Sequence, residues 1–382
     1  MMIPRNLEKS LLSSKQNLLL LGPRQTGKST LVHALKPDLE INFADQATYL
    51  SFAKNPSELK ERLGGARAKN IFIDEVQRLP SVLNTIQVLI DKNPGWFKFY
   101  LTGSSARKLK RGHANLLPGR VHLHYLSPLV TSELGHEMDS GEALASGTLP
   151  GIWSEKEREE KHRTLRSYAA TYIKEEIQAE SLTRNLEGFS RFLFVIAAEA
   201  GKFLDLSKLS RESAVPRQSI VRYFEILEDT LIVNRSETFS KSTRRRPIQA
   251  PRFFFFDTGV LNGLLENFSV SSDRIGMLFE HLIFNQLVGS ALSRDQSFRI
   301  SSYRTEHGAE VDFLFELSGK MYAIEVKASK NIAKLDTRGF RSFSEYYGKK
   351  HESVVLYLGN ITKRIEGIDI FPWQVFFKKI GL

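Results

Sequence analysis

The sequence predicts an α/β fold in which a parallel sheet with a phosphate-binding loop is followed by a helical region and a second α/β domain. Two observations carry this prediction. The segment NLLLLGPRQTGKSTLV (17–32) has the pattern of an apolar strand, a glycine-bounded loop and the start of a helix. Nearer the C-terminus, EVDFLFELSGKMYAIEVKA (310–328) has the pattern of two strands joined by a tight turn.

Composition indicates a multi-domain protein with excess positive charge. The chain has 382 residues, more than one ordinary core holds, so we expect two or three domains. The formal charge of +11 favours a polyanionic partner, most commonly nucleic acid, although a protein can also simply be basic. The lack of cysteine excludes disulfides and thiolate metal sites. With no secretory leader and no apolar run of about 20 residues, we expect a cytoplasmic protein that does not enter membranes.

The first motif is a complete match to G-x-x-x-x-G-K-[ST] at residues 22–29. Its glycines let backbone N–H groups close around phosphates, which also lie at the positive end of the following helix. Lys28 is expected to reach the β- and γ-phosphates, and the Ser29 hydroxyl to bind magnesium, so ATP and Mg²⁺ are the expected cofactors. The residues expected around the nucleotide are Gly22, Pro23, Arg24, Gln25, Thr26, Gly27, Lys28, Ser29 and Thr30.

A second strand, Ile71–Ile73, ends in Asp74 and Glu75. Ligands of open α/β sheets bind at the C-terminal ends of the strands, so Asp74 is expected in the magnesium shell and Glu75 beside the attacking water. Adjacent acids at a strand end also cap helices, which is the structural alternative.

A third strand, Phe97–Leu101, leads into Thr102 and Ser104. Their hydroxyls either contact the γ-phosphate or cap the next helix. Arg120 follows in a short turn before a strand at 121–126; it either reaches a neighbouring subunit's nucleotide or is an ordinary surface residue.

These motifs resemble the AAA+ ATPases, and more narrowly a bacterial and archaeal group whose ATPase domain precedes a C-terminal region of unknown function. The resemblance covers nearly the whole chain and rests on the phosphate loop and on IFIDEVQRLP, YLTGSS, LPGR, VHLHYLSPL, ALASGTLPGIW, YAATYIKEEI, APRFFFFDTGV, YRTEHGAEVDF and AIEVKAS. It implies that Lys28 and Ser29 bind phosphate and magnesium, that Asp74 and Glu75 form the acidic strand end, and that Thr102 or Ser104 senses the γ-phosphate. It further implies that Arg120 is an arginine finger, and hence that the protein forms a homo-oligomer.

The middle of the chain has the pattern of a DNA-binding module. Residues 136–160 are expected to link domains, and helical patterning returns at 163–182. The apolar spacing in 205–233 predicts a helix–turn–helix, and LEDTLIVNRSETFS (227–240) a wing-like hairpin. Such winged helices bind either DNA or proteins. The side chains expected to face DNA are Arg217, Gln218, Ser219 and Arg222, with the basic run Lys241, Arg244, Arg245 and Arg246, while Phe253–Phe256 is expected to be a buried strand.

The last third carries the pattern D-x12-E-x-K, formed by Asp312, Glu325 and Lys327. Two carboxylates and a lysine would meet on one face of the hairpin, the acids for a divalent cation and the lysine for developing negative charge. Alternation of acid and lysine also occurs on ordinary exposed strands. The pattern resembles the restriction-endonuclease-like superfamily, which implies a metal site that Glu280 completes, in a centre that either cleaves DNA or only grips it. Glu310 shares a strand face with Asp312 and is expected to assist.

The expected division is a P-loop AAA+ ATPase domain at 1–135, a helical linker or lid at 136–185, a winged-helix domain at 186–248 and a nuclease-like domain at 249–382. Two functions fit it. The first is an ATP-dependent machine that moves or remodels DNA. The second is a nucleotide-controlled switch whose C-terminal half binds a protein partner.

Overall fold

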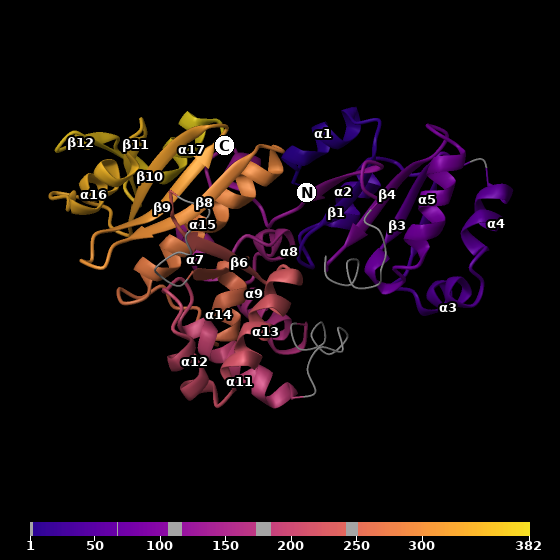
Figure 1. Cartoon of the computed structure of the whole chain (residues 1–382), viewed down its shortest axis with the longest axis horizontal. Helices are drawn as coiled ribbons and strands as arrows, with labels where there is room; N and C mark the ends of the chain where they lie inside the picture. The colour runs from indigo at the N-terminus through magenta and orange to yellow at the C-terminus, as the bar shows by residue number, and fades with distance from the viewer. Residues whose placement is uncertain (1–2, 67, 106–116, 173–184, 242–250) are drawn as a thin grey trace. The chain divides into compact units, whose positions relative to one another are not determined.

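The structure, a computed structural model, describes residues 3–66, 68–105, 117–172, 185–241 and 251–382. The chain divides into two compact units (Figure 1). The N-terminal unit comprises Met2–Ser127 with Asp229–Leu231, and the C-terminal unit comprises Pro128–Glu228 with Ile232–Leu382. The four-part division expected from the sequence stays a prediction about folding domains.

The N-terminal unit is built on a five-stranded sheet in which all strands run parallel. In spatial order the strands are β2 (Leu39–Asn42), β3 (Asn70–Asp74), β4 (Lys98–Gly103), β1 (Asn17–Leu21) and β5 (Val121–Tyr125). The strands predicted around residues 17–21, 71–75, 97–101 and 121–126 are confirmed. Their carboxyl ends therefore lie along one edge of the sheet, where the acidic and hydroxyl residues follow them.

The inner strands of this sheet, β3, β4 and β1, are buried on both faces, to which successive side chains of a strand point in turn. In β1, Leu19 and Leu21 belong to one apolar core, while Leu18 and Leu20 belong to another. Among the described residues of the unit, the helices and the short 3-10 turn are α1 (Asn6–Ser13), α2 (Lys28–Ala34), α3 (Gln46–Lys54), α4 (Glu58–Gly65), η1 (Val76–Arg78) and α5 (Val82–Lys92). Near-continuous apolar strands are the pattern that a doubly covered parallel sheet requires.

The C-terminal unit is built on an eight-stranded mixed sheet. In spatial order its strands are β12 (Lys363–Ile365), β13 (Ile368–Pro372), β11 (Glu352–Tyr357), β10 (Lys320–Lys327), β9 (Glu310–Leu317), β8 (Phe298–Arg304), β6 (Val233–Thr238) and β7 (Arg252–Phe255). The predicted hairpin at 310–328 is confirmed as the antiparallel pair β9–β10, which turns at Ser318 and Gly319. The predicted buried strand at Phe253–Phe256 is confirmed as β7, whose residues are all buried.

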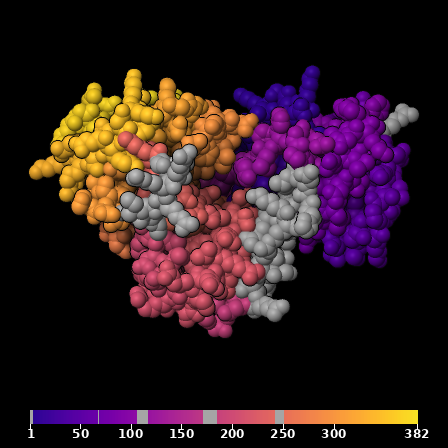
Figure 2. Space-filling model, viewed as in Figure 1, coloured from indigo at the N-terminus to yellow at the C-terminus, as the bar shows by residue number. Residues whose placement is uncertain are grey.

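Helices cover both faces of this sheet and extend into a helical bundle. They are η2 (Thr131–Leu134), α7 (Ser140–Ser146), α8 (Pro150–Ser154), α9 (Arg158–Ser167), η3 (Tyr168–Tyr172), α11 (Leu186–Ala198), α12 (Leu206–Ser213), α13 (Arg217–Asp229), α14 (Thr258–Leu264), α15 (Ile275–Ser293), α16 (Arg338–Tyr347) and α17 (Trp373–Ile380). One apolar core runs from Met138 to Leu382 and joins the bundle to the sheet. Figure 2 shows this part of the chain, coloured magenta to yellow, packed as one continuous body.

One predicted element is described only in part, and another differs from the structure. The first part of the helix expected at 163–182 is α9, which starts at Arg158, followed by the π-helical turn η3, and residues 173–182 lie outside the described residues. The hairpin expected at 227–240 is wrong, because α13 continues to Asp229 and the segment supplies one strand, β6. β6 pairs with β7 and also with β8, so it is part of the large sheet.

Among the described residues, α15 is the one helix that is long and apolar enough to cross a membrane by length and composition. Most of its length is buried, against β9, β10 and neighbouring helices, which is the position of a core helix.

Candidate functional site

The phosphate loop lies between β1 and α2. Gly22 has no room for a side chain, because a Cβ would come within 2.3 Å of the Leu126 carbonyl oxygen. Gly27 has a φ of 90°, the left-handed conformation that glycine adopts readily. Lys28 then begins α2, and its buried Nζ donates hydrogen bonds of 2.9 Å each to the carbonyl oxygens of Gly22 and Pro23. The lysine charge is therefore held against the loop.

A residue that the sequence patterns did not single out binds the backbone of the rest of the loop. Arg5, just before α1, is buried and donates to the Thr26 carbonyl at 2.6 Å and to the Ser127 carbonyl at 2.7 Å. The Thr26 hydroxyl donates to the Pro23 carbonyl at 2.9 Å. Of the other predicted loop residues, Arg24 is half-buried and Gln25 and Thr30 are exposed.

The predicted magnesium residues meet at the sheet edge. The Ser29 hydroxyl donates to Asp74 Oδ2 at 2.8 Å, and the Thr102 hydroxyl donates to Asp74 Oδ1. Three segments far apart in the sequence thus converge on one buried carboxylate. A hydroxyl and a carboxylate oxygen are ligands that hydrated Mg²⁺ accepts, so Ser29 and Asp74 could hold the metal of a bound nucleotide.

Glu75 and Ser104 are joined by a residue that was not predicted. Glu75 adopts a left-handed φ of 56°, which turns the chain sharply after β3. The Gln77 amide Nε2 donates to the Glu75 carboxylate and, at 2.9 Å, to the Ser104 hydroxyl. Gly103 makes room for Gln77, because a Cβ there would lie 2.8 Å from Gln77 Oε1. Gln77 lies within the segment IDEVQ, but its role depends on β4, so local spacing did not reveal it.

Arg120 lies at the start of β5 and pairs with Asp91 of α5. Its Nε lies 2.7 Å from Asp91 Oδ1 and its Nη2 3.0 Å from Oδ2. The hydrogen bond from Arg120 lowers the pKa of the exposed Asp91 carboxyl. A further hydrogen bond goes to the Pro118 carbonyl. None of these described partners belongs to the phosphate loop.

The predicted DNA-facing residues lie on the C-terminal unit. Arg217 and Arg222 are exposed on α13, whose opposite face is buried through Ile220, Tyr223 and Phe224. Lys241 is exposed, and its Nζ lies 5.0 Å from the ring centroid of Tyr346 on α16. Arg244, Arg245 and Arg246 lie outside the described residues.

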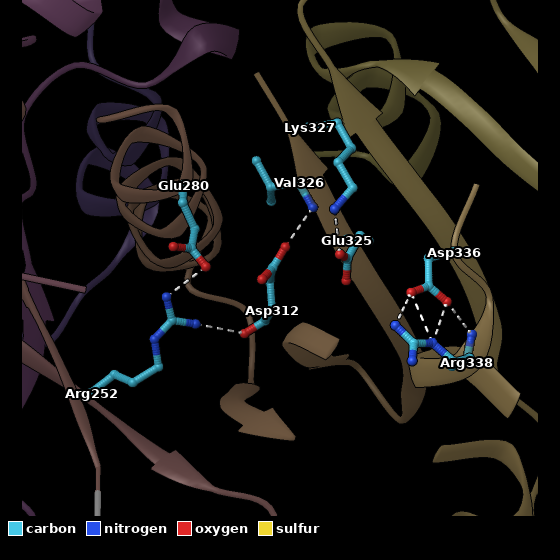
Figure 3. A network of polar contacts seen from close by, with 8 residues as sticks. All are labelled: Arg252, Glu280, Asp312, Glu325, Val326, Lys327, Asp336 and Arg338. Atoms are coloured by element: carbon cyan, nitrogen blue, oxygen red, sulfur yellow. Dashed lines mark hydrogen bonds and ion pairs between the residues drawn. The ribbon is translucent and has the colours of Figure 1, made fainter. Parts of the chain in front are cut away.

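The acids of the D-x12-E-x-K pattern lie near Glu280 of α15, as Figure 3 shows. Asp312 Oδ2 accepts a hydrogen bond of 2.7 Å from the Val326 amide, and Glu325 Oε1 lies 2.7 Å from Lys327 Nζ. Glu280 Oε1 lies 2.5 Å from Nη2 of Arg252, a buried residue that the sequence patterns did not identify. Glu310, expected to assist, lies 3.6 Å from Arg304 Nε.

The electrostatics show how closely these acids interact. Burial, then the charges of Glu280 and Glu325, raises the pKa of the Asp312 carboxyl well above its ordinary value. Burial also raises the pKa of Glu325, against the opposing effect of Lys327. Burial alone would lower the pKa of the Lys327 ammonium, but the Glu325 carboxylate raises it.

Within the described part of the chain, no three carboxylate or imidazole side chains are arranged so that they could hold a metal ion. Glu280, Asp312 and Glu325 each face a different donor, Arg252, Val326 N–H and Lys327 (Figure 3). The donor set that the endonuclease resemblance implies for a metal therefore does not fit a metal in this arrangement.

Comparison with known families divides the chain into three successive matches. Residues 14–135 match an AAA domain, residues 139–271 a domain of unknown function (DUF8612), and residues 275–376 a second domain of unknown function (DUF4143). Uncharacterized proteins of Mycobacterium bovis and Mycobacterium tuberculosis are each 26% identical to this chain over 316 residues, which is 81% of this chain and 70% of theirs.

Solved structures also match, including the following two. A replication initiator, DnaA, bound to AMPPCP and single-stranded DNA is 13% identical, with a TM-score of 0.29, over 58% of this chain and 86% of that chain. A signal transduction ATPase with numerous domains from Pyrococcus horikoshii, which carries a tetratricopeptide repeat sensor, is 14% identical. Its TM-score is 0.30, over 76% of this chain and 45% of that chain.

Proposed function

We propose that this chain, an AAA domain followed by two domains of unknown function, hydrolyses ATP with Mg²⁺ and uses the reaction to act on DNA. The observation that supports hydrolysis most directly is the junction at Asp74, where the Ser29 and Thr102 hydroxyls both donate to one carboxylate. The phosphate loop, the acidic strand end and the third strand therefore meet at one point, as phosphoryl transfer requires.

Each side chain has a distinct task in this proposal. The loop N–H groups and the N-terminus of α2 bind phosphate, and Lys28 exchanges its carbonyl acceptors for charged phosphate oxygens, which are stronger acceptors. Mg²⁺, when bound, neutralises charge on the transferred phosphate. Glu75 takes the proton of the attacking water, and Gln77 fixes the carboxylate for that task. Thr102 and Ser104 report on the γ-phosphate.

Two substitutions separate binding from hydrolysis. Lys28→Ala is expected to lose ATP binding, because it removes the cation that the phosphates meet. Glu75→Gln is expected to bind ATP but to hydrolyse it about 10²-fold or more slowly, because the amide cannot accept a proton. Nucleotide binding measured by fluorescence and turnover measured by phosphate release distinguish the two effects. Undiminished turnover in Glu75→Gln would remove Glu75 from the chemistry.

The DNA part of the proposal is supported by charge and by α13. The net charge is +11, and α13 presents Arg217 and Arg222 to solvent beside a buried face, as a helix that contacts phosphates does. ATPase rates with single-stranded, duplex and branched DNA, and without DNA, test it. Turnover stimulated by DNA supports the proposal. Slow turnover that no DNA alters would favour the nucleotide-controlled switch instead.

We also propose that the ATPase sites are shared between copies in a homo-oligomer, with Arg120 acting on a neighbour's nucleotide. In support, Arg120 directly precedes β5, an edge strand of the sheet, and its guanidinium forms an ion pair with Asp91 of α5. Mixing inactive Arg120→Ala and Glu75→Gln proteins should restore part of the ATPase rate, because hybrid interfaces carry one intact arginine and one intact glutamate. A monomer with full ATPase activity would contradict this proposal.

A further inference from the structure

Arg252 lies at one side of the acidic group formed by Glu280, Asp312 and Glu325, next to Glu280 (Figure 3). It is the first residue of β7, and 3% of its side chain is exposed. A buried arginine cannot lose its charge, so the protein must supply acceptors for its donors. The identity and geometry of those acceptors show which groups this cation holds (Figure 3).

Three segments supply the acceptors. Arg252 Nη2 lies 2.5 Å from Glu280 Oε1, and Nη1 donates to the Asp312 carbonyl oxygen at 3.2 Å. Nε donates to the carbonyl oxygen of Gly201, which has a φ of 79° and lies in the loop after α11. The position of the guanidinium is thus fixed from α15, from β9 and from this loop at once.

Apolar contacts fix the same group further. The Arg252 guanidinium carbon lies 5.0 Å from the ring centroid of Phe254, 5.5 Å from that of Phe313 and 5.6 Å from that of Phe203. Aromatic rings attract a desolvated cation. Arg252 is therefore a permanent part of the core and has little freedom to leave Glu280.

The other two acids also have fixed partners. Asp312 Oδ2 accepts from the Val326 amide at 2.7 Å, and Glu325 Oε1 lies 2.7 Å from Lys327 Nζ. A divalent cation requires several carboxylate oxygens turned toward one point. Here Glu280 Oε1 is turned toward Arg252, and a metal that took this oxygen would remove the negative charge that the buried arginine is paired with, which is strongly unfavourable.

We infer that Arg252 is the resident cation of this acidic group, that it keeps Glu280 from sharing a divalent metal with Asp312 and Glu325, and that the wild-type acids bind no such metal. Arg252 is buried and therefore cannot touch a substrate, so it acts as a positioning residue for Glu280. Replacing Arg252 with a neutral residue converts Glu280, Asp312 and Glu325 into a divalent-cation site. Neither Arg252 nor the three acids takes part in the proposed hydrolysis of ATP.

Manganese binding tests this directly on the full chain without nucleotide. Free Mn²⁺ gives an EPR signal that is lost on binding, so titration yields the number of ions bound. Wild-type protein and an Asp312→Asn/Glu325→Gln variant should bind Mn²⁺ alike. Arg252→Gln should bind one Mn²⁺ ion more than the wild type does. The Kd of that extra ion should be at least about tenfold lower than the Kd of any Mn²⁺ ion that the wild type binds. That extra ion should disappear when Asp312→Asn and Glu325→Gln are added.

A matched control is Arg338→Gln. Arg338 is also an arginine paired with an acid, Asp336, but that pair lies on the surface (Figure 3). Arg338→Gln should leave Mn²⁺ binding unchanged. If Arg252→Gln does not fold, as judged by circular dichroism, the wild-type comparison decides alone. One ion bound by the wild type and lost in Asp312→Asn/Glu325→Gln would overturn the inference.

Discussion

At the scale of single residues, Gln77 holds the proposed general base in place. Its amide donates to the Glu75 carboxylate and to the Ser104 hydroxyl, and it is almost completely buried. Gln77→Met keeps the size of the side chain but removes both hydrogen bonds. We expect kcat for ATP hydrolysis to fall about 10- to 100-fold with little change in KM, because Glu75 loses its orientation while the phosphate loop stays intact. Steady-state kinetics measures both constants.

Gln46→Met is the matched control, since Gln46 is exposed at the start of α3 in the same unit. It should leave kcat unchanged. If Gln77→Met raised KM and kept kcat, the amide would serve nucleotide binding and not the orientation of Glu75.

At the scale of an element, α15 carries a buried imidazole that makes stability depend on pH. His281 is completely buried and its Nε2 lies 2.7 Å from the Phe255 carbonyl oxygen of β7. Burial lowers the pKa of His281 to about 4, so in acid the unfolded chain takes up a proton before the folded one does. The contribution of His281 to the free energy of unfolding is complete above its unfolded pKa, near 6.5, and is lost as the pH falls toward 4. The free energy of unfolding changes by about 3 kcal/mol over this range.

His281→Gln keeps a donor for that carbonyl but does not titrate. Urea unfolding between about pH 7 and pH 4.5 should therefore show a smaller loss of stability in the variant than in the wild type. Burial raises the pKa of Asp257 to about 6, so the stability that protonated Asp257 contributes is lost as the pH rises through that value. This pH dependence has the opposite sign to that of His281 and is the same in the variant and the wild type. The exposed His307, changed to Gln, is the control and should keep the wild-type slope. Parallel curves for His281→Gln and wild type would refute the assignment.

At the scale of the whole molecule, the charge of +11 predicts DNA binding that weakens steeply with salt. Each phosphate contact contributes about −0.9 to the slope of log affinity against log salt concentration. Arg217→Gln/Arg222→Gln should therefore flatten the slope by about 2 if both arginines contact phosphates. Fluorescence anisotropy of labelled duplex DNA over a salt series measures the slope.

The charge-matched control is Arg338→Gln/Arg364→Gln, because both residues are exposed and pair with acids of the same unit. It should leave the slope near that of the wild type. Equal effects of the two double variants would mean that DNA responds to total charge and not to α13.

Across the whole molecule, the sequence predicted what depends on neighbours in the chain. The phosphate loop, Asp74 at its strand end and the β9–β10 hairpin follow from short patterns of apolar, glycine and acidic residues. Arg5, Gln77 and Arg252 were not predicted, because each acts through residues from another segment. The hairpin predicted at 227–240 failed for the same reason, since the partners of β6 are β7 and β8. Long-range pairing leaves no local signal.

The double pairing of β6 limits how this protein can be taken apart. Residues 233–236 of β6 pair with β7, and residues 237–238 pair with β8. If the chain is cut before β6, the N-terminal fragment lacks β6 and with it any strand of the eight-stranded sheet. If the chain is cut after β6, that fragment ends in a strand without its neighbours β7 and β8, and such an unpaired strand can join other chains. The helices before β6 and the sheet after it therefore belong to one compact unit. We expect a truncation on either side of β6 to disturb the folding of both parts.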